Sequence, residues 1–473
     1  MTIKPKGNPK RQKEVKMEIL DLLKEKKISK VTELLDDMNN VDIAALLQEI
    51  DLQDAIKVFR LLKTDDAAEV FSYIEPEKQK EIIEVISEPE INKIIDELFI
   101  DDTVDIIEAM PANVVKKILK SAKPDLRREI NKFLAYPDNS AGSIMTPEFL
   151  DLRLNMTVNQ ALERIRKIGD YKETVNSCYV LDATKHLIGV LSIKELLLSQ
   201  PDVLIDDIME TNVIFCNTLT DQEEVTHIIK KYDLLCIPVV DAEKRMVGII
   251  TIDDIIDVID EEATEDIQKM AAITPSDTPY LKTSVWRIWL NRVPWLLILM
   301  VSATFTGIII NKNEEMLNLP TIGIILTGCI PMLMDTGGNA GSQASVTVIR
   351  SIALGEVTIK DIFKVIFKEL RVSVLLGATL AVACFGKLML IDRLYAVQPH
   401  GFLVALVICL TMFITIVIAK LIGCSLPLVA KACKLDPAVV ASPFITTIVD
   451  ALSLIIYCGI SVAVLGQFYQ TIL

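Results

Sequence analysis

The sequence predicts a multidomain membrane protein: an all-α, solenoid-like amino-terminal domain, a tandem pair of small α/β domains, a connecting helix and a transmembrane domain of five helices. Three observations lead to this prediction. Short helical patterns repeat over residues 16–135, a strand-and-helix pattern occurs twice over 140–258, and most of the chain after Trp286 is apolar. The 473 residues are 51% hydrophobic, which is more than one core needs.

The amino-terminal domain, residues 1–136, is predicted from repeated amphipathic segments. Apolar residues recur in each segment at positions i, i+3 and i+4, as they do on one face of a helix. Each segment begins with an acidic residue, which the helix dipole stabilises in the first turn. These residues are Asp42, Asp54, Asp66 and Asp102. The repetition predicts a stacked, solenoid-like array of short helices.

The two α/β domains are predicted from an internal duplication. The sequence Ile-Met-Thr-Pro at 144–147 is echoed by Ile-Met-Glu-Thr at 208–211. A strand–turn–strand pattern at 179–192 recurs at 238–251, and each copy leads into a helical pattern. Two β-α-β-β-α units follow from this alternation. We assign them to residues 137–203 and 204–259.

The rest of the chain divides into a charged connecting segment, 260–284, and a transmembrane domain, 285–473. The connecting segment has carboxylates on several faces of a predicted helix that extends to Met270. Beyond it, five stretches have the roughly 20 apolar residues needed to cross hydrocarbon. They are 288–310, 321–349, 370–391, 401–428 and 444–465.

The charge distribution predicts a protein of the plasma membrane with its amino terminus in the cytosol and its carboxyl terminus outside the cell. No apolar run follows the basic start of the chain, so we expect no cleavable signal peptide. Five spans then place most basic residues inside, as the positive-inside rule requires. Those inside are Lys282, Arg287, Arg292, Arg350, Lys360, Lys364, Lys368, Arg371, Lys431 and Lys434. Those outside are Lys312, Lys387 and Arg393, whereas Lys420 in the fourth span fits neither group.

Composition and motifs exclude several classes of function. Residues 1–280 hold 35 Lys and Arg against 55 Asp and Glu, whereas a nucleic-acid-binding protein needs a basic surface to displace counterions. The nine cysteines include no Cys-x-x-Cys pair and the three histidines are scattered, so no zinc site is predicted. No phosphate-binding loop, Gly-x-Ser-x-Gly or paired-carboxylate pattern occurs. We therefore predict no catalytic residue and no enzyme activity.

Asp450 is the strongest candidate for a functional residue in the membrane. It is the only ionisable side chain before Tyr457 in the last apolar stretch. A carboxylate near the bilayer centre costs at least ~2.5 kcal/mol on insertion scales, so it normally faces a water-filled path or a partner. A protonated or Lys-paired Asp inside the helix bundle is the structural alternative.

A second candidate is the segment 331–343, which carries three glycines and two amides inside the second apolar stretch. The Gly337-Gly338 pair permits close approach or unwinding of the backbone. Asn339 and Gln343 share one helical face, which favours a pore lining over a plain packing face. Mg²⁺ keeps several of its waters and uses few carboxylates, so its chemistry suits such a lining.

A third candidate is a set of acidic residues in the soluble part. Each alone is best interpreted as a solvated surface residue. Together they suit water-mediated Mg²⁺ sites between domains, because like charges repel one another when the ion leaves. The set is Asp101, Asp102, Asp105, Asp233, Asp253, Asp254, Asp257, Glu262, Glu265 and Asp266.

Several segments are similar to those of one known family: FLAYPDNSAGSIM, TDQEEVTHIIKKYDLLCIPVVD, VGIITIDDIIDVIDEEATED, the Gly-Gly-Asn segment, KELRVSVLLG and DPAVVASPFITTIVD. They resemble the MgtE-type magnesium channels or transporters, over nearly the full chain. The resemblance implies a homodimer in which each subunit has a helical amino-terminal domain, a tandem CBS pair, a connecting plug helix and five membrane helices. It also allows ATP binding at the CBS pair, for which no single residue is decisive.

The resemblance implies roles for individual residues. Asp450 matches the pore aspartate that binds hydrated Mg²⁺ in the family. The pore-lining segment matches at Gly337, Gly338 and Asn339, and Asp436 lies near the cytosolic mouth. The carboxylates that match regulatory Mg²⁺ ligands are Asp102, Asp105, Asp233, Asp254, Asp257, Glu262, Glu265 and Asp266. Two departures from the family pattern, Ser442 and Lys420, bear on ion selectivity.

The resulting hypothesis is a Mg²⁺ channel or transporter that mediates influx. High cytosolic Mg²⁺ would bridge the acidic surfaces and hold the plug over the pore. Two other functions stay open, a membrane-anchored adenine-nucleotide sensor and a coupled transporter for Mg²⁺ or Co²⁺. Asp450 and the Gly-Gly-Asn segment argue against the sensor, since a membrane anchor needs neither.

Overall fold

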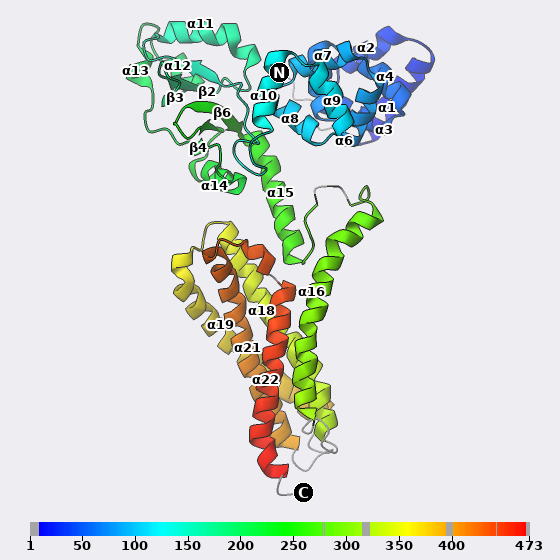
Figure 1. Ribbon diagram of the computed structural model, residues 1–473, viewed down its shortest axis with the longest axis vertical. Coiled ribbons are helices and arrows are strands. Elements are labelled where there is room, and N and C mark those ends of the chain that lie inside the picture. Colours follow the sequence, from blue (N-terminus) through cyan, green and yellow to red (C-terminus); the bar gives the residue numbers. More distant parts are fainter. Residues whose placement is uncertain are drawn as a thin grey trace. The chain divides into compact units, whose positions relative to one another are not determined.

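The computed structural model describes residues 9–276, 278, 280–314, 322–393, 401–440 and 442–469. The chain forms two compact units, Met1–Val258 and Ile259–Leu473. Figure 1 shows the helices and strands of each unit.

The first part of unit 1 is an array of short helices. They are α1 (Pro9–Lys24), α2 (Ile28–Asp36), α3 (Asn40–Glu49), α4 (Leu52–Phe59), α5 (Thr64–Ser72), α6 (Pro76–Val85), α7 (Glu88–Glu97), α8 (Ile100–Glu108), α9 (Ala112–Ser121) and α10 (Pro124–Phe133). Alternate helices pack on one another, α3 on α5, α5 on α7 and α7 on α9. Asp42, Asp54, Asp66 and Asp102 lie in first helical turns. The predicted stacked array is confirmed.

The second part of unit 1 contains two α/β domains with the same topology. The first has β1 (Leu150–Leu152), α11 (Val158–Ile168), η1 (Gly169–Tyr171), β2 (Ser177–Leu181), β3 (Leu187–Ser192) and α12 (Ile193–Leu198). The second has α13 (Ile205–Ile208), β4 (Cys216–Asn217), α14 (Gln222–Tyr232), β5 (Cys236–Val240), β6 (Met246–Thr251) and α15 (Ile252–Met270). In each sheet the first two strands are parallel and the last two antiparallel. The predicted β-α-β-β-α duplication is confirmed.

The two α/β domains exchange backbone hydrogen bonds through the duplicated Ile-Met segments. Thr146 and Ile249 of β6 exchange two bonds of 2.8 Å, and Glu210 makes the equivalent pair with Val190 of β3. A glycine on each sheet makes room for the crossing segment. A Cβ on Gly248 would lie 2.8 Å from the Thr146 carbonyl oxygen, and one on Gly189 would lie 2.5 Å from Met209 Sδ. The duplication is therefore also an interlock.

Substitution of Gly248 by Val is expected to destabilise this interlock by about 1–3 kcal/mol, the usual cost of overpacking a core. The backbone of Thr146 cannot give way without losing its bonds to β6. Urea unfolding of a soluble fragment of residues 1–270 measures the effect. Ala242→Val, at an exposed turn position, is the control and should change stability by no more than about 0.5 kcal/mol. Equal stability of the two variants would contradict the interlock.

Unit 2 contains the end of α15 and, among the described residues, a bundle of long helices with short helical segments. These are α16 (Val285–Lys312), α18 (Ile322–Ala353), η2 (Ile359–Asp361), α19 (Ile362–Gly386), η3 (Lys387–Ile391), α21 (Gly401–Ala432), η4 (Pro437–Val440) and α22 (Ser442–Tyr469). Among the described residues, four segments are long and apolar enough to cross a membrane: Val285–Lys312, Ile359–Ile391, Gly401–Ala432 and Pro437–Leu465. The more polar α18 packs between them against α21 and α22. Residue 321, the start of the predicted second span, lies outside the described residues.

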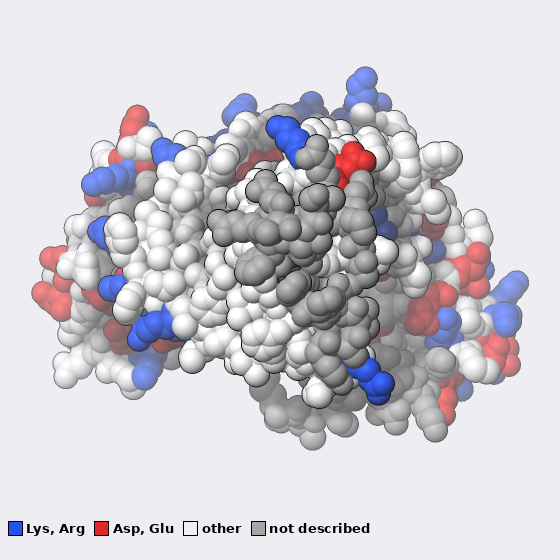
Figure 2. Space-filling model, turned by 90° about the horizontal axis from the view of Figure 1, so that it is seen from below, with Lys and Arg blue, Asp and Glu red and all other residues white. Residues whose placement is uncertain are grey.

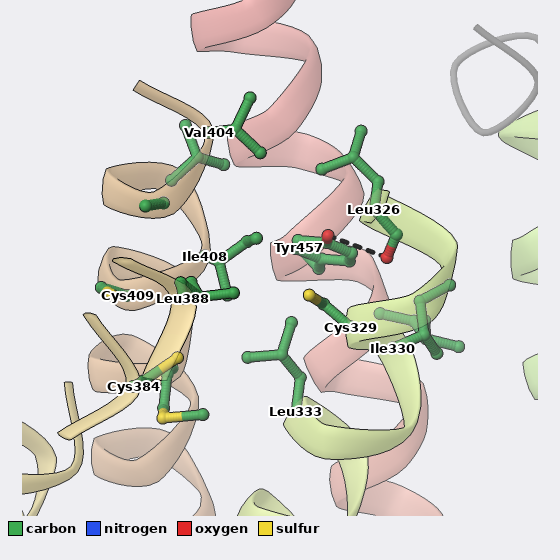
Figure 3. Close-up of a cluster of buried hydrophobic side chains, with 14 of the residues drawn as sticks. Leu326, Cys329, Ile330, Leu333, Cys384, Leu388, Val404, Ile408, Cys409 and Tyr457 are labelled. Carbon is green, nitrogen blue, oxygen red and sulfur yellow. Dashed lines mark hydrogen bonds between the residues drawn. The ribbon is translucent and has the colours of Figure 1, made fainter. Parts of the chain in front are cut away.

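Close packing along α18 depends on its glycines. α18 stays helical through Gly337 and Gly338, so these residues permit close approach and not unwinding. A Cβ on Gly423 of α21 would overlap the Gly341 carbonyl oxygen of α18. At the other end of α18, the buried Tyr457 hydroxyl of α22 donates a 3.0 Å hydrogen bond to the Leu326 carbonyl oxygen, as Figure 3 shows. α18 thus packs closely against both α21 and α22.

Candidate functional site

Asp450 lies half-buried on α22, beside α18. Its Oδ1 atom is buried, and no described residue gives it a hydrogen bond. The carboxylate of Asp335 on α18 is near enough to interact with it electrostatically. Two neighbouring carboxylates, one with an unsatisfied buried oxygen, suit a cation between or near them.

A polar face of α18 runs from Asp335 through Asn339 to Gln343, in steps of four residues. All three side chains are exposed, although the helix lies in an apolar bundle. Gly337 and Gly338 lie on the packed face instead, where a Cβ would be 2.7 Å from Thr415 and 2.8 Å from Thr446 respectively. Asp335 was not among the site residues predicted from the sequence. Its position four residues before Asn339, on the same helical face, would have identified it.

Asp436 lies with the carboxylates of the connecting helix. Lys269 of α15 donates 2.6 Å hydrogen bonds to Asp436 Oδ2 and to Glu265 Oε1. Burial and the Asp436 charge raise the pKa of Asp266 to about 6, although Lys269 lowers it, and Glu262 contributes more weakly. The structure thus brings together four predicted ligands: Glu262, Glu265, Asp266 and Asp436. Asp436 was predicted near the cytosolic mouth of the pore, and Lys269 was not predicted as a site residue.

A second acidic cluster lies in unit 1, between α8 and the α/β domains. Burial raises the pKa of Asp101 to about 9 and of Asp102 to about 6, with contributions from neighbouring carboxylates. Burial and the charge of Asp254 raise the pKa of Glu173 to about 7. The Asp101 Oδ1 atom is buried, with no hydrogen-bond partner among the described residues. Buried carboxylates that repel one another suit a divalent cation.

Glu148 and Glu173 belong to this cluster and were not predicted. Glu148 accepts a 2.6 Å hydrogen bond from Thr146, and Asp254 accepts one of 2.6 Å from Thr251. Both missed residues lie in connecting segments outside the helices and strands. No periodic pattern marks such positions, so the sequence alone does not indicate their role.

Other predicted regulatory residues lie at exposed positions. Asp233 ends α14 in the left-handed conformation, with φ at 51°, and its backbone N–H bonds to Ile229. The side chains of Asp105 and Asp257 are exposed. Among the described residues, no group of three or more His, Cys, Asp and Glu is arranged to hold a metal ion. Hydrated Mg²⁺ needs only one or two carboxylates, so the two clusters keep their role as candidates.

The unit 1 cluster predicts that stability falls as pH rises. Asp101, Asp102 and Glu173 have pKa values raised above those of the unfolded chain, so the folded state binds more protons between pH 4 and about 9. In EDTA, the melting temperature of residues 1–270 should be lower at pH 8 than at pH 5.5. Mg²⁺ should narrow the difference, because it replaces the lost protons. Calorimetry checks this. Asp101→Asn, the matched variant, should be less sensitive to pH, and an unchanged pH dependence would contradict the assignment.

Lys420, which sequence analysis left unexplained, forms a buried ion pair inside the membrane bundle. Its amine lies 3.1 Å from Glu369 Oε2 on α19, and the two side chains are 6% and 14% exposed. The pair accounts for a cation within the fourth span. Because Lys420 is paired with Glu369, it is not a lysine that neutralises Asp450.

Three protein families match this chain, and the matched residues lie in the same order along it as the predicted domains. A family described as a divalent cation transporter matches residues 330–460. The MgtE intracellular N domain matches 38–139, and the CBS domain matches 141–201 and 205–261.

Known relatives cover most of the chain. The magnesium transporter MgtE of Thermus thermophilus is 34% identical over 366 residues, which are 76% of this chain and 79% of that protein. Its Bacillus subtilis counterpart is 34% identical over 363 residues, 77% of this chain and 78% of that protein. A crystal structure of the soluble part of a magnesium transporter has a TM-score of 0.51 at 32% identity, covering 53% of this chain and 99% of that one. A cytosolic domain of the Mg²⁺ channel MgtE in complex with ATP has a TM-score of 0.49 at 34% identity, covering 51% and 99%.

Proposed function

Because this chain belongs to the MgtE family of magnesium transporters, we propose that it mediates Mg²⁺ influx through a gated membrane pore. The observation that carries the proposal is the pair of carboxylates Asp450 and Asp335, next to the polar face of α18 in an apolar bundle. Carboxylates and amides that retain the waters of the ion suit hydrated Mg²⁺. Transport of this kind needs no catalytic residue.

The pore is proposed to form between two subunits. In hydrocarbon, exposed Asp335, Asn339 and Gln343 would be costly, so this face of α18 needs water or protein against it. A second copy related by twofold symmetry supplies both, because it places two copies of Asp450 and of the α18 face around one axis. α16, in which no residue is buried, offers further surface for that contact.

The proposed topology has the amino terminus in the cytosol and the carboxyl terminus outside, with five membrane helices per subunit. The ten basic residues assigned to the inside lie at or near one end of the membrane helices. Only Lys312, Lys387 and Arg393 are assigned to the other end. The near face in Figure 2, seen from below, is mostly uncharged where it is described. This asymmetry supports the orientation.

We propose that cytosolic Mg²⁺ closes the pore through the two acidic clusters. One cluster lies between α8 and the CBS pair, and the other joins α15 to Asp436 of the membrane unit. Mg²⁺ bound there would hold the domains and the connecting segment 260–284, the plug, in a closed arrangement. Loss of the ion restores repulsion between the carboxylates, and this repulsion releases the domains and the plug.

Flux into proteoliposomes of defined orientation tests the function. The expected result is Mg²⁺ entry that stops when millimolar Mg²⁺ is present on the side of the soluble domains. A current series with Mg²⁺, Mn²⁺, Co²⁺ and Ca²⁺ measures selectivity. Entry that requires a second ion gradient would favour a coupled transporter, and no flux with tight nucleotide binding would favour a membrane-anchored sensor.

ATP is proposed as a second ligand, at the CBS pair of residues 137–259. The proposal rests on the two CBS matches and the paired β-α-β-β-α units. Calorimetry with ATP on residues 1–270, with and without Mg²⁺, tests it. Absence of binding under both conditions would reject ATP and leave the pore proposal intact.

A further inference from the structure

Lys269, near the end of α15, forms two ion pairs within unit 2. Lys269 is 22% exposed, and its amine lies 2.6 Å from both Glu265 and Asp436. Burial alone would lower the pKa of this amine, but the hydrogen bonds to Asp436 and Glu265 raise it above the usual value, so it is charged. The next residue, Met270, packs against Ile349 and Ala438.

Asp436 is itself held in place for this contact. Its Oδ1 atom accepts a 2.8 Å hydrogen bond from the backbone N–H of Ala438, which leaves Oδ2 for Lys269. The Asp266 carboxylate is close enough to interact electrostatically with both Asp436 and Lys269. The ammonium group of Lys269 therefore bonds to Glu265 and Asp436 and interacts electrostatically with Asp266.

We propose that Lys269 is a built-in cation that competes with Mg²⁺ for these carboxylates and so sets the Mg²⁺ concentration at which the connecting helix docks. The inference rests on the proposed Mg²⁺ regulation and deepens it. A carboxylate oxygen that accepts a hydrogen bond from the Lys269 ammonium group has a less negative electrostatic potential around it. It therefore attracts a second cation more weakly. Mg²⁺ must therefore displace the amine or bind beside it against repulsion. The same ammonium holds part of the contact together when Mg²⁺ is absent.

Two opposite effects follow from removing the charge with Lys269→Met. Without Mg²⁺, α15 should be less protected, because the carboxylates now repel one another. In a Mg²⁺ titration, the midpoint of protection should fall about tenfold, because the competitor has gone. A lysine that only cross-links α15 to Asp436 would give the first effect without the second. Lys269→Arg keeps the charge and should stay within about twofold of the wild-type midpoint.

The experiment is hydrogen–deuterium exchange of peptides from residues 259–276 in the full-length protein, titrated with Mg²⁺ and read by mass spectrometry. Lys431→Met, which removes an exposed charge from the end of α21, is the control and should leave the midpoint unchanged. Lys269→Gln removes the same charge but keeps a polar side chain, so its midpoint should also fall about tenfold. It provides a second variant if Lys269→Met does not fold.

The outcomes separate this inference from the proposed regulation. A wild-type midpoint that Lys269→Met leaves unchanged or raises would overturn the role of Lys269 and leave the regulation standing. If Lys269→Met does not fold, an unchanged or raised midpoint in Lys269→Gln, or a tenfold lower midpoint in Lys269→Arg, would overturn it. Exchange that does not respond to Mg²⁺ in the wild-type protein would overturn both. A lower midpoint in Lys269→Met with wild-type behaviour in Lys269→Arg and Lys431→Met supports the inference.

Discussion

Replacement of Asp450 by Asn is expected to lower Mg²⁺ flux by at least about 100-fold, which corresponds to the loss of an ion–carboxylate interaction worth about 3 kcal/mol. The substitution keeps the shape of the side chain and removes its charge. The buried Oδ1 atom of Asp450 has no partner among the described residues, so little of the fold depends on it. Flux into proteoliposomes, normalised to the amount of folded protein, is the measurement.

Two further variants sharpen this test. Asp335→Asn removes the neighbouring carboxylate and should reduce flux less, by about tenfold, because Asp335 is exposed at the edge of the α18 polar face. Asp361→Asn is the control, since Asp361 ends η2, immediately before α19, and its carboxylate lies 2.8 Å from Lys364. Wild-type flux in Asp450→Asn would reject Asp450 as the pore site.

Breaking the Lys420–Glu369 pair is expected to have the largest effect on stability. Lys420→Met leaves the Glu369 carboxylate, 14% exposed, without its partner, and removal of one member of a buried pair typically costs about 3–5 kcal/mol. The double variant Lys420→Met, Glu369→Leu should recover most of the loss, because replacement of both charges leaves none uncompensated. Thermal unfolding of the detergent-solubilised protein, monitored by size-exclusion chromatography, checks the order of the variants.

An exposed ion pair of the same kind is the matched control. Lys387 and Asp392 are 2.7 Å apart, but their side chains are 45% and 35% exposed. Lys387→Met should therefore lower stability by no more than about 1 kcal/mol. Equal losses of stability in Lys420→Met and Lys387→Met would contradict the larger effect expected from burial of the Lys420–Glu369 pair. A double variant as unstable as Lys420→Met would contradict the explanation by an unpaired buried charge.

Local patterns predicted the elements of this fold well. The first-turn acids Asp42 and Asp54 and the duplicated segments at 144–147 and 208–211 all begin or border elements where expected. Such elements depend on residues within a few positions of one another, so their periodicity is visible in the chain. The interlock of the two α/β domains was not predicted, because it joins Thr146 to Ile249 across more than a hundred residues.

The candidate sites were predicted less completely, for the same reason. Asp450 stood out because one carboxylate in an apolar stretch is a local anomaly. Asp335, Glu148 and Glu173 did not, since their significance comes from neighbours on other elements. The separation of Asn339 from the Gly337–Gly338 pair likewise required the helix to be seen against α21 and α22.

The sequence by itself determined the order of domains, the membrane stretches and the presence of costly charges at Asp450 and Lys420, because composition and period are properties of neighbouring residues. The tertiary structure decided which charges meet. It paired Lys420 with Glu369 and Lys269 with Asp436, contacts that span 51 and 167 positions in the chain. Electrostatic interaction depends on distance in space and on burial, and neither quantity can be read along a chain before it folds.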